Sequence, residues 1–309
     1  GSSSASYRQP VIESLTAVVT VTDEGGSSGR LRRDFRIPPP GDIRNCLVAL
    51  AGDEALLARL FDYRFKSGLG LRGHSFGNLF LAALTNITRD FAKAVRVSSE
   101  ILAVQGEIFP STLSDVHLQA RLVDGRTVYG ESRITNTHVP IQKLSVKPNN
   151  CKPLPETIAA IKAADLITVG PGSLYTSLIP NLLVRGISEQ ICRSKALRLY
   201  VGNLMTQPGE SRRYTAAHHL RALNDHAGCN IFDGIILNTT KVSQPMRKRY
   251  AAHRAEPVLN DLEEIEKLGV RPILANLLGK NHVARHDSAR LAQLLVTLAG
   301  KGTPFPNSR

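Results

Sequence analysis

Five short apolar runs constrain the fold of this chain more than any other feature of its sequence. The runs cover residues 15–22, 166–169, 197–201, 234–237 and 272–275. Each run ends at a polar turn, which in most cases contains glycine or asparagine. After the turn, apolar residues recur at helical spacing. Near-continuous apolar strands that alternate with helices are typical of a parallel sheet that is covered on both faces. The pattern predicts a doubly wound α/β fold with a mostly parallel sheet.

Two segments interrupt this alternation. From residue 54 to residue 98 the apolar residues keep a helical period, broken by a glycine-bounded turn at 73–78. From 115 to 133 the period changes to two, and Asp124-Gly125 marks a hairpin turn. We expect this antiparallel hairpin to be an insertion into, or an edge extension of, one domain over 1–309. A loop, a helix and a frayed tail are expected at 147–155, 156–164 and 303–309.

The charge of the chain favours anionic ligands. The 309 residues include 27 Arg and 12 Lys against 26 acidic residues, which gives a formal net charge of +13. A positive field attracts phosphorylated metabolites, nucleic acids and acidic membranes alike, and arginine suits bidentate phosphate recognition. The basic residues are spread along the chain without a basic run, so a nucleic acid partner is the less favoured reading.

The cysteines and the hydropathy indicate a cytoplasmic protein without a membrane span. The four cysteines lie far apart, form no CxxC pair and suggest neither a zinc site nor a disulfide framework: Cys46, Cys151, Cys192 and Cys229. No uninterrupted apolar stretch reaches the ~20 residues that a membrane span needs. The start of the chain lacks the charged-then-apolar pattern of a signal peptide.

A glycine-rich turn after the run at 166–169 is a candidate phosphate site. Backbone amides at such a strand-to-helix turn point into one concave spot, and the helix N-terminus adds a positive partial charge. Gly170-Pro171-Gly172-Ser173 fits this mechanism, and Tyr175 and Thr176 can add a hydroxyl each. The turn matches neither a Walker A loop nor GxGxxG, and a tight turn that needs glycine for its dihedral angles explains it equally well.

A second glycine-rich segment follows the first run. Asp23 and Glu24 end the strand, and Gly25-Gly26-Ser27-Ser28-Gly29-Arg30 comes next. The carboxylates suit Mg²⁺ or ribose hydroxyls, whereas the serines, amides and Arg30 suit phosphate. The alternative is a flexible surface loop, but three glycines within five residues favour a binding loop.

Two further turns carry polar residues. In Pro38-Pro39-Pro40-Gly41-Asp42, the prolines stiffen the chain ahead of Asp42, which either caps the following helix or lines a polar pocket; Arg44 and Asn45 share its first turn. The turn at 73–78 holds His74 and Asn78. A lone histidine is more often a satisfied hydrogen-bonding residue than a catalyst.

The remaining candidates carry less information. His218 and His219 are adjacent, cannot jointly bind a metal at i, i+4 spacing, and are expected at the surface. Tyr250 either stacks on a base or covers the core edge, and Arg285 either reaches a phosphate or forms a surface ion pair. GxSxG, HExxH and HxE…CxxC are all absent, which disfavours the familiar hydrolases.

Five ordered motifs together resemble the YvcK branch of the YvcK/CofD-like family. They are DEGGSSGRLRRDF at 23–35, PPPGDIRN at 38–45, GHSFGNL at 73–79, GPGSLYTSLIPNL at 170–182 and YVGNLMTQPGE at 200–210. The resemblance implies a Rossmann-like fold and a cytoplasmic gluconeogenesis factor tied to carbon metabolism, cell shape and envelope synthesis. It also implies that the chain binds a UDP-sugar such as UDP-N-acetylglucosamine as its ligand, and it implies no definite cofactor.

The CofD branch supplies the alternative. Its members transfer a 2-phospholactyl group from a nucleotide-activated donor to a deazaflavin, with Mg²⁺. Such a transferase would hold Mg²⁺ on Asp23 and Glu24 and would place His74 or Asp42 near the acceptor. No separate catalytic machinery is visible, and the GGSSGRLRR and PPPGDIRN elements match the YvcK branch, so a regulatory binding protein is the leading hypothesis.

The sequence departs from the family pattern at two places. The family starts with a strand and a GGGTG-type loop, which should lie just before Ser2, so that Gly1 would be the last glycine of that loop. The usual Asp-Asp pair is Asp23-Glu24 here. A glutamate keeps the charge but extends the reach of the carboxylate.

The candidate residues of these segments together form one predicted nucleotide site. The glycine-rich segments would hold the diphosphate, Arg30 and Arg44 would balance its charge, and Asn78 and Asn203 would contact sugar or ribose hydroxyls. A regulatory protein partner and a homo-oligomer are open possibilities. The predicted nucleotide-binding residues are Asp23, Gly25, Gly26, Ser27, Ser28, Gly29, Arg30, Asp42, Arg44, Asn45, His74, Asn78, Gly170, Gly172, Ser173, Tyr175, Thr176, Asn203, Tyr250 and Arg285.

Overall fold

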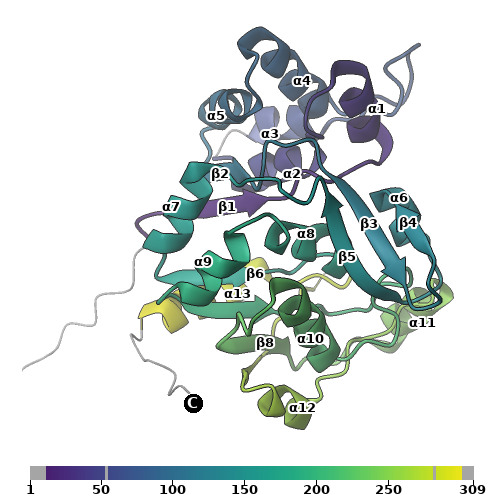
Figure 1. The fold of residues 1–309 in the computed structure, drawn as a ribbon, viewed down its shortest axis with the longest axis vertical. Coiled ribbons are helices and arrows are strands. Elements are labelled where there is room, and N and C mark those ends of the chain that lie inside the picture. Colours follow the sequence, from purple (N-terminus) through teal and green to yellow (C-terminus); the bar gives the residue numbers. More distant parts are fainter. Residues whose placement is uncertain (1–11, 53–54, 281–282, 301–309) are drawn as a thin grey trace, which may run out of the picture.

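A four-stranded parallel sheet forms one half of the molecule (Figure 1). The computed structural model describes residues 12–52, 55–280 and 283–300. The sheet has the order β6-β7-β8-β9, and all its neighbours pair in parallel. Its strands confirm four of the five predicted runs: β6 (Leu166–Val169), β7 (Leu197–Val201), β8 (Gly234–Asn238) and β9 (Arg271–Ala275).

Helices cover both faces of this sheet, as the apolar runs predict. On one face Leu199, Val201 and Ile236 pack against leucines of α13 (Ser288–Gly300). Tyr200 and Ile235 alternate with these residues and belong to the main core. Helix α10 (Ala216–Ala227) packs into that core on the second face. Because successive strand residues point to opposite faces, a strand buried on both sides must be apolar throughout.

The first predicted run forms a separate small sheet. Strand β1 (Thr16–Val19) pairs in parallel with β2 (Glu107–Pro110), in the register Thr16 to Glu107. Among the described residues this pair has no ladder to the four-stranded sheet, so the parallel strands form two sheets rather than one. Figure 1 shows the early helices gathered around this end of the molecule. They are α1 (Gly26–Phe35), α2 (Gly41–Leu50), α3 (Ala55–Asp62), α4 (Phe76–Thr88) and α5 (Phe91–Ile101).

The predicted antiparallel insertion is present, with an additional strand. Strand β3 (His117–Leu122) pairs with β4 (Thr127–Tyr129) on one side and with β5 (Ile141–Lys147) on the other. The short helix α6 (Glu131–Thr135) replaces the end of the second predicted strand. The remaining helical elements are α7 (Pro155–Ala163), η1 (Leu174–Leu178), α8 (Ile179–Leu182), α9 (Ile187–Arg193), α11 (Gln244–Ala252) and α12 (Leu262–Lys267).

Two expectations are wrong. The structure joins Cys192 and Cys229 in a disulfide, because the fold brings together residues that lie 37 positions apart. His219 is buried, since it lies on the apolar face of α10, where it stacks on Tyr200; His218 is exposed. The expected opening loop at Gly1 and the tail at 303–309 lie outside the described residues. Within the described ranges, no helix combines the length and apolarity that crossing a membrane requires.

The connection after β7 packs directly on the antiparallel insertion, and Gly209 makes this contact possible. A Cβ atom there would overlap the backbone carbonyl of Thr135, at the end of α6. Backbone atoms cannot yield as a flexible side chain does. We predict that Gly209→Ala lowers the free energy of unfolding by about 2 kcal/mol or more. Urea unfolding tests this, with Ser132→Ala on the exposed face of α6 as control; equal stability of both variants would contradict the packing.

Candidate functional site

Three helix N-termini meet beyond the carboxyl end of β1. The Oγ atom of Ser27, in the first turn of α1, lies 2.9 Å from Nδ1 of His74, just before α4. The Nδ2 group of Asn78 in α4 donates to Ser28 Oγ over 3.3 Å. Helix α2 begins at Gly41, whose backbone lies against Ser28 and Asp23. Each helix start carries about +0.5 of an elementary charge, so this point is electropositive.

Three amides at the start of α1 have no hydrogen-bond partner among the described residues. Gly25 is the N-cap, and the helix starts at Gly26, so the segment predicted as a loop is a helix N-terminus. Within the described part of the chain, the N–H groups of Gly26, Ser27 and Ser28 make no hydrogen bond, whereas that of Gly29 closes the first turn. The Oδ1 atom of Asn78 is also buried without a partner. Such a helix start binds phosphate or another anion.

Asp23 and Glu24 diverge and do not form a joint metal pair. Asp23 Oδ1 accepts a hydrogen bond from Gly25 N over 2.8 Å, and its other oxygen faces the start of α2. The Glu24 carboxylate turns the other way, to Nδ1 of His117 at 2.6 Å and to Arg32 at 3.8 Å. Among the described residues, no three His, Cys, Asp or Glu side chains lie together as metal ligands do. The predicted use of Asp23 and Glu24 as Mg²⁺ ligands therefore does not fit this arrangement.

Two carboxyl groups near this point hold their protons unusually tightly. Burial raises the pKa of Asp42 to about 6, and the neighbouring Asp23 adds to the rise. Burial also raises the pKa of Glu131 to about 7, although Glu24 N donates to its Oε2 over 3.2 Å. Asp23, Asp42 and Glu210 add to this second rise by repulsion. Carboxyl groups crowded in a half-dry site resist simultaneous ionisation.

The turn after β6 is already partly filled by a carboxylate of the protein. Glu210 accepts hydrogen bonds from Tyr175 N at 2.8 Å and from Thr176 N at 3.3 Å, and from Thr176 Oγ1 at 2.7 Å. The Thr176 hydroxyl, a predicted phosphate donor, is thus engaged inside the protein, and the Tyr175 hydroxyl lies 2.9 Å from the hydroxyl of Tyr214. Burial raises the pKa of Glu210, and these donated bonds oppose the rise.

Two amide side chains hold the turn at 170–173 in place. Nδ2 of Asn203, which follows β7, donates to the Gly172 carbonyl over 2.9 Å. Nε2 of Gln207 donates to Ser173 Oγ over 2.7 Å. Gly170 has φ +84°, a left-handed conformation that favours glycine. Asn203 and Ser173 therefore belong to one hydrogen-bonded cluster with the glycine turn.

One hydrogen bond joins this turn to the end of β1. The Oγ1 atom of Thr22 donates to the carbonyl of Thr176 over 3.4 Å. Thr22, Thr176 and Glu210 are all buried. The structure thus brings the two predicted glycine-rich segments to one region, lined by carboxyl groups from three further parts of the chain.

The predicted cations differ in their freedom to bind phosphate. Arg44 is buried and forms an ion pair with Asp62, so it braces α2 against the end of α3. Arg30 is half-buried beside the helix start, and its Nη2 donates to the Arg72 carbonyl over 2.9 Å. Asn45 is exposed on α2. Of these residues, Arg30 lies closest in the chain to the free amides.

Tyr250 lies in α11, which follows β8, and Arg285 lies in the segment between β9 and α13. The Tyr250 hydroxyl accepts a hydrogen bond from Ala284 N over 3.1 Å, which ties α11 to the segment after β9. Arg285, the next residue, is exposed. Both residues follow carboxyl ends of parallel strands, where ligands of open α/β sheets bind.

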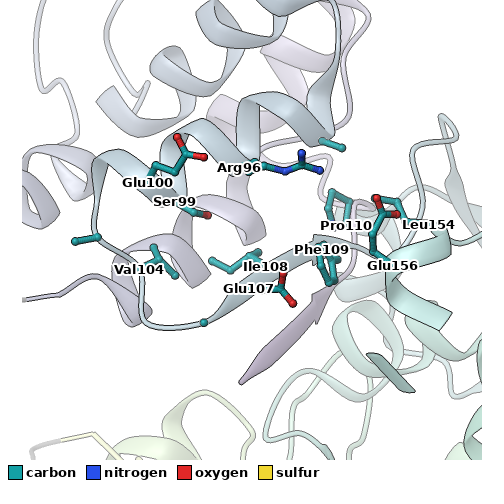
Figure 2. Close-up of a pocket in the computed structure, with 13 residues that line it drawn as sticks. Arg96, Ser99, Glu100, Val104, Glu107, Ile108, Phe109, Pro110, Leu154 and Glu156 are labelled. Carbon is teal, nitrogen blue, oxygen red and sulfur yellow. The ribbon is translucent and has the colours of Figure 1, made fainter. Parts of the chain in front are cut away.

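A groove of about 260 Å³ lies elsewhere, between α5 and β2 (Figure 2). Its lining includes Arg96, Glu100, Glu107 and Glu156, and no predicted site residue. We place the functional site at the strand ends because the unsatisfied donors and the perturbed carboxyl groups are there.

Sequence reasoning missed Glu131, Glu210 and Gln207. Glu131 lies on the insertion and Glu210 on the connection after β7, so only the folded chain brings them to the site. The motif at 200–210 contained Gln207 and Glu210, but their partners in the turn after β6 lie 34 or 35 residues away.

Ionisation of the Glu131 carboxyl group destabilises the folded state. The pKa of Glu131 in the folded state is about 7, above the ordinary 4.5, so between these pH values the folded state binds a proton that the unfolded state releases. The free energy of unfolding therefore falls as the pH rises through about 7. Glu131→Gln mimics the neutral form. We expect both proteins to melt alike near pH 5 and the variant to gain over the native chain by pH 8. Thermal unfolding across this range measures the difference; a constant difference would contradict the assignment.

Comparisons with known proteins agree with this architecture. The model of the family described as "2-phospho-L-lactate transferase CofD" matches residues 4–278. A solved structure of protein BH3568 from Bacillus halodurans superimposes with a TM-score of 0.90 at 45% identity, covering 92% of this chain and 91% of that one. A second structure of the same protein is described as a member of the UPF0052 family and gives a TM-score of 0.89.

Curated relatives extend the similarity over most of the chain. The "Gluconeogenesis factor" of Bacillus subtilis (strain 168) is 48% identical over 285 residues, which cover 92% of this chain and 90% of that protein. The protein of the same name from Halalkalibacterium halodurans is 45% identical over 284 residues, 92% of this chain and 88% of that protein. A relative from Nostoc sp. is 51% identical over 289 residues, and this chain spans 63% of its length. The chain belongs to the CofD/YvcK family.

Proposed function

We propose that this chain is a regulatory protein that binds a nucleotide-sugar of the UDP-N-acetylglucosamine type. The meeting of three helix N-termini at free backbone amides carries the proposal, because such a point binds a diphosphate without a metal ion. Relatives named gluconeogenesis factor support a role in carbon metabolism. We extend the proposal to a cytoplasmic protein that links this metabolism to cell shape and envelope synthesis through a protein partner.

Each part of the ligand is assigned to one group of residues. The diphosphate lies between the start of α1 and the Gly172 turn, with Arg30 balancing its charge. Asn78 and Asn203 contact hydroxyl groups of the sugar or ribose. Tyr250 stacks on the base, and Arg285 contacts a phosphate. Arg44 keeps a supporting role, since its guanidinium is committed to Asp62.

The second candidate is a transferase of the CofD kind. The similarity to the family described as "2-phospho-L-lactate transferase CofD" favours it, and so do Asp42 and His74 beside the unpaired amides. Burial and the nearby Arg30 lower the pKa of His74, so its imidazole is neutral and can accept a proton. This candidate requires turnover, whereas the leading proposal requires binding alone.

Calorimetric titration separates the two functions. The chain is titrated with UDP-N-acetylglucosamine, UDP, GDP and a deazaflavin, with and without Mg²⁺. We expect preferential binding of the UDP-sugar without turnover. Binding of GDP and deazaflavin but not of the UDP-sugar, followed by phospholactyl transfer, would support the transferase instead.

A charge placed in the glycine turn tests the site itself. We predict that Gly172→Asp weakens UDP-sugar binding at least a hundredfold, because its carboxylate would occupy the place of a phosphate. Gly172→Ala is the matched control, since a Cβ atom there meets Leu178 Cδ2 at 3.0 Å in both variants. The control should retain affinity within several-fold. Thermal unfolding checks that both variants fold; unchanged affinity in the aspartate variant would place the diphosphate elsewhere.

A further inference from the structure

The connection between α3 and α4 is a protruding hairpin. Phe65 N donates to the His74 carbonyl over 2.9 Å, Gly73 N donates to the Phe65 carbonyl over 2.8 Å, and Phe76 N donates to the Tyr63 carbonyl over 2.8 Å. These bonds close an antiparallel loop over residues 63–76. In Figure 1 it projects from the molecule beside α1, at the upper right. We call residues 63–75 the α3–α4 hairpin.

Its tip exposes apolar side chains to solvent. Leu69 is fully exposed at 106%, and it stands between Gly68 and Gly70, which both have positive φ angles. Leu71 is 42% exposed, and Tyr63, at the base of the hairpin, is 50% exposed. Within the described residues nothing covers Leu69, so its whole apolar surface remains in contact with water. A grouped set of exposed apolar residues marks an interaction surface.

The charged residues of the α3–α4 hairpin are all basic. The sequence contains no Asp or Glu from Tyr63 to Arg89, whereas Arg64, Lys66 and Arg72 lie within the hairpin. The side chains of Lys66 and Arg72 make no hydrogen bond or ion pair with the described residues, and both are exposed. The preceding Asp62 is committed to Arg44. Apolar side chains and free cations therefore share one projecting loop.

We propose that the α3–α4 hairpin attaches the protein to the surface of an anionic lipid bilayer. Leu69 and Leu71 enter the interface between headgroups and acyl chains, while Lys66 and Arg72 contact lipid phosphates. The binding of an interfacial segment strengthens with the apolar area that it buries and with its electrostatic attraction to anionic lipids. Each cation near an anionic surface strengthens binding about fivefold.

The shape of the hairpin favours a bilayer over a protein partner. Its apolar residues stand on a convex tip, and a protein would need a matching acidic cup around Leu69. A lipid surface deforms around such a tip and presents negative charge on every side. The proposal goes beyond the nucleotide site and does not rest on it, because neither Leu69 nor Lys66 takes part in ligand binding.

Flotation with lipid vesicles tests the proposal on this chain. The vesicles contain either 30% phosphatidylglycerol in phosphatidylcholine or phosphatidylcholine alone, at 0.1 M NaCl. We expect the chain to float with the anionic vesicles and to remain largely free with the neutral ones. Combined Leu69→Ser and Leu71→Ser should weaken binding at least tenfold. Combined Lys66→Gln and Arg72→Gln should weaken it ten- to thirtyfold.

Two matched variants show whether the hairpin itself is responsible. Val123→Ser removes a 60% exposed apolar residue from another turn, and combined Lys162→Gln and Lys195→Gln remove two exposed charges elsewhere. Both should bind vesicles within about twofold of the native chain. Absence of binding to anionic vesicles would overturn the proposal, as would native binding by the leucine variant. Loss of a dimer in the hairpin variants, seen by sedimentation without vesicle binding, would assign the hairpin to a second copy.

Discussion

The site depends on a balance between buried carboxyl groups and the positive ends of three helices. Asp23 and Asp42 lie where α1, α2 and α4 begin, and the helix dipoles offset part of the cost of their burial. The offset is incomplete, because burial and the presence of Asp23 still raise the pKa of Asp42 to about 6. In our proposal, a diphosphate bound at the unpaired amides would favour the protonated form of these neighbouring carboxyl groups.

The two sheets and the insertion each supply one part of this balance. The end of β1 provides Asp23, the insertion provides Glu131, and the connection after β7 provides Glu210. Glu210 already binds the amides after the Gly172 turn, as an external phosphate would. In the proposed site, the unpaired amides of α1 would therefore bind most of the diphosphate, and the turn after β6 would lie on its other side.

The sequence was sufficient to predict strands but not the contacts between distant segments. The four strands of the larger sheet were predicted because residues buried on both faces must be apolar. Strand β5 was missed because its pairing with β3 shifts register between Arg121 and Leu122. This shift interrupts the alternation of buried and exposed residues along β5. The burial of His219 was predictable, since it lies on the same helical face as Ala216 and Leu223.

The position of a candidate residue in the fold was predictable only where its neighbours in sequence define it. The glycine-rich segments, His74, Asn78 and Asn203 lie at the strand and helix ends that their neighbours in sequence indicated. The start of α1 was mistaken for a loop, because glycine and serine have low helix propensity and tertiary packing overrides it here. The engagement of Arg44 by Asp62, and of Thr176 by Glu210, depends on side chains that no sequence pattern connects.

Hydrogen–deuterium exchange with UDP-N-acetylglucosamine tests the central claim most directly. The account predicts slower exchange of the free amides at 26–28 and of the turn at 172–173, with no change in the groove lined by Arg96 and Glu107. Protection confined to that groove, or no protection at 26–28 with saturating ligand, would contradict it.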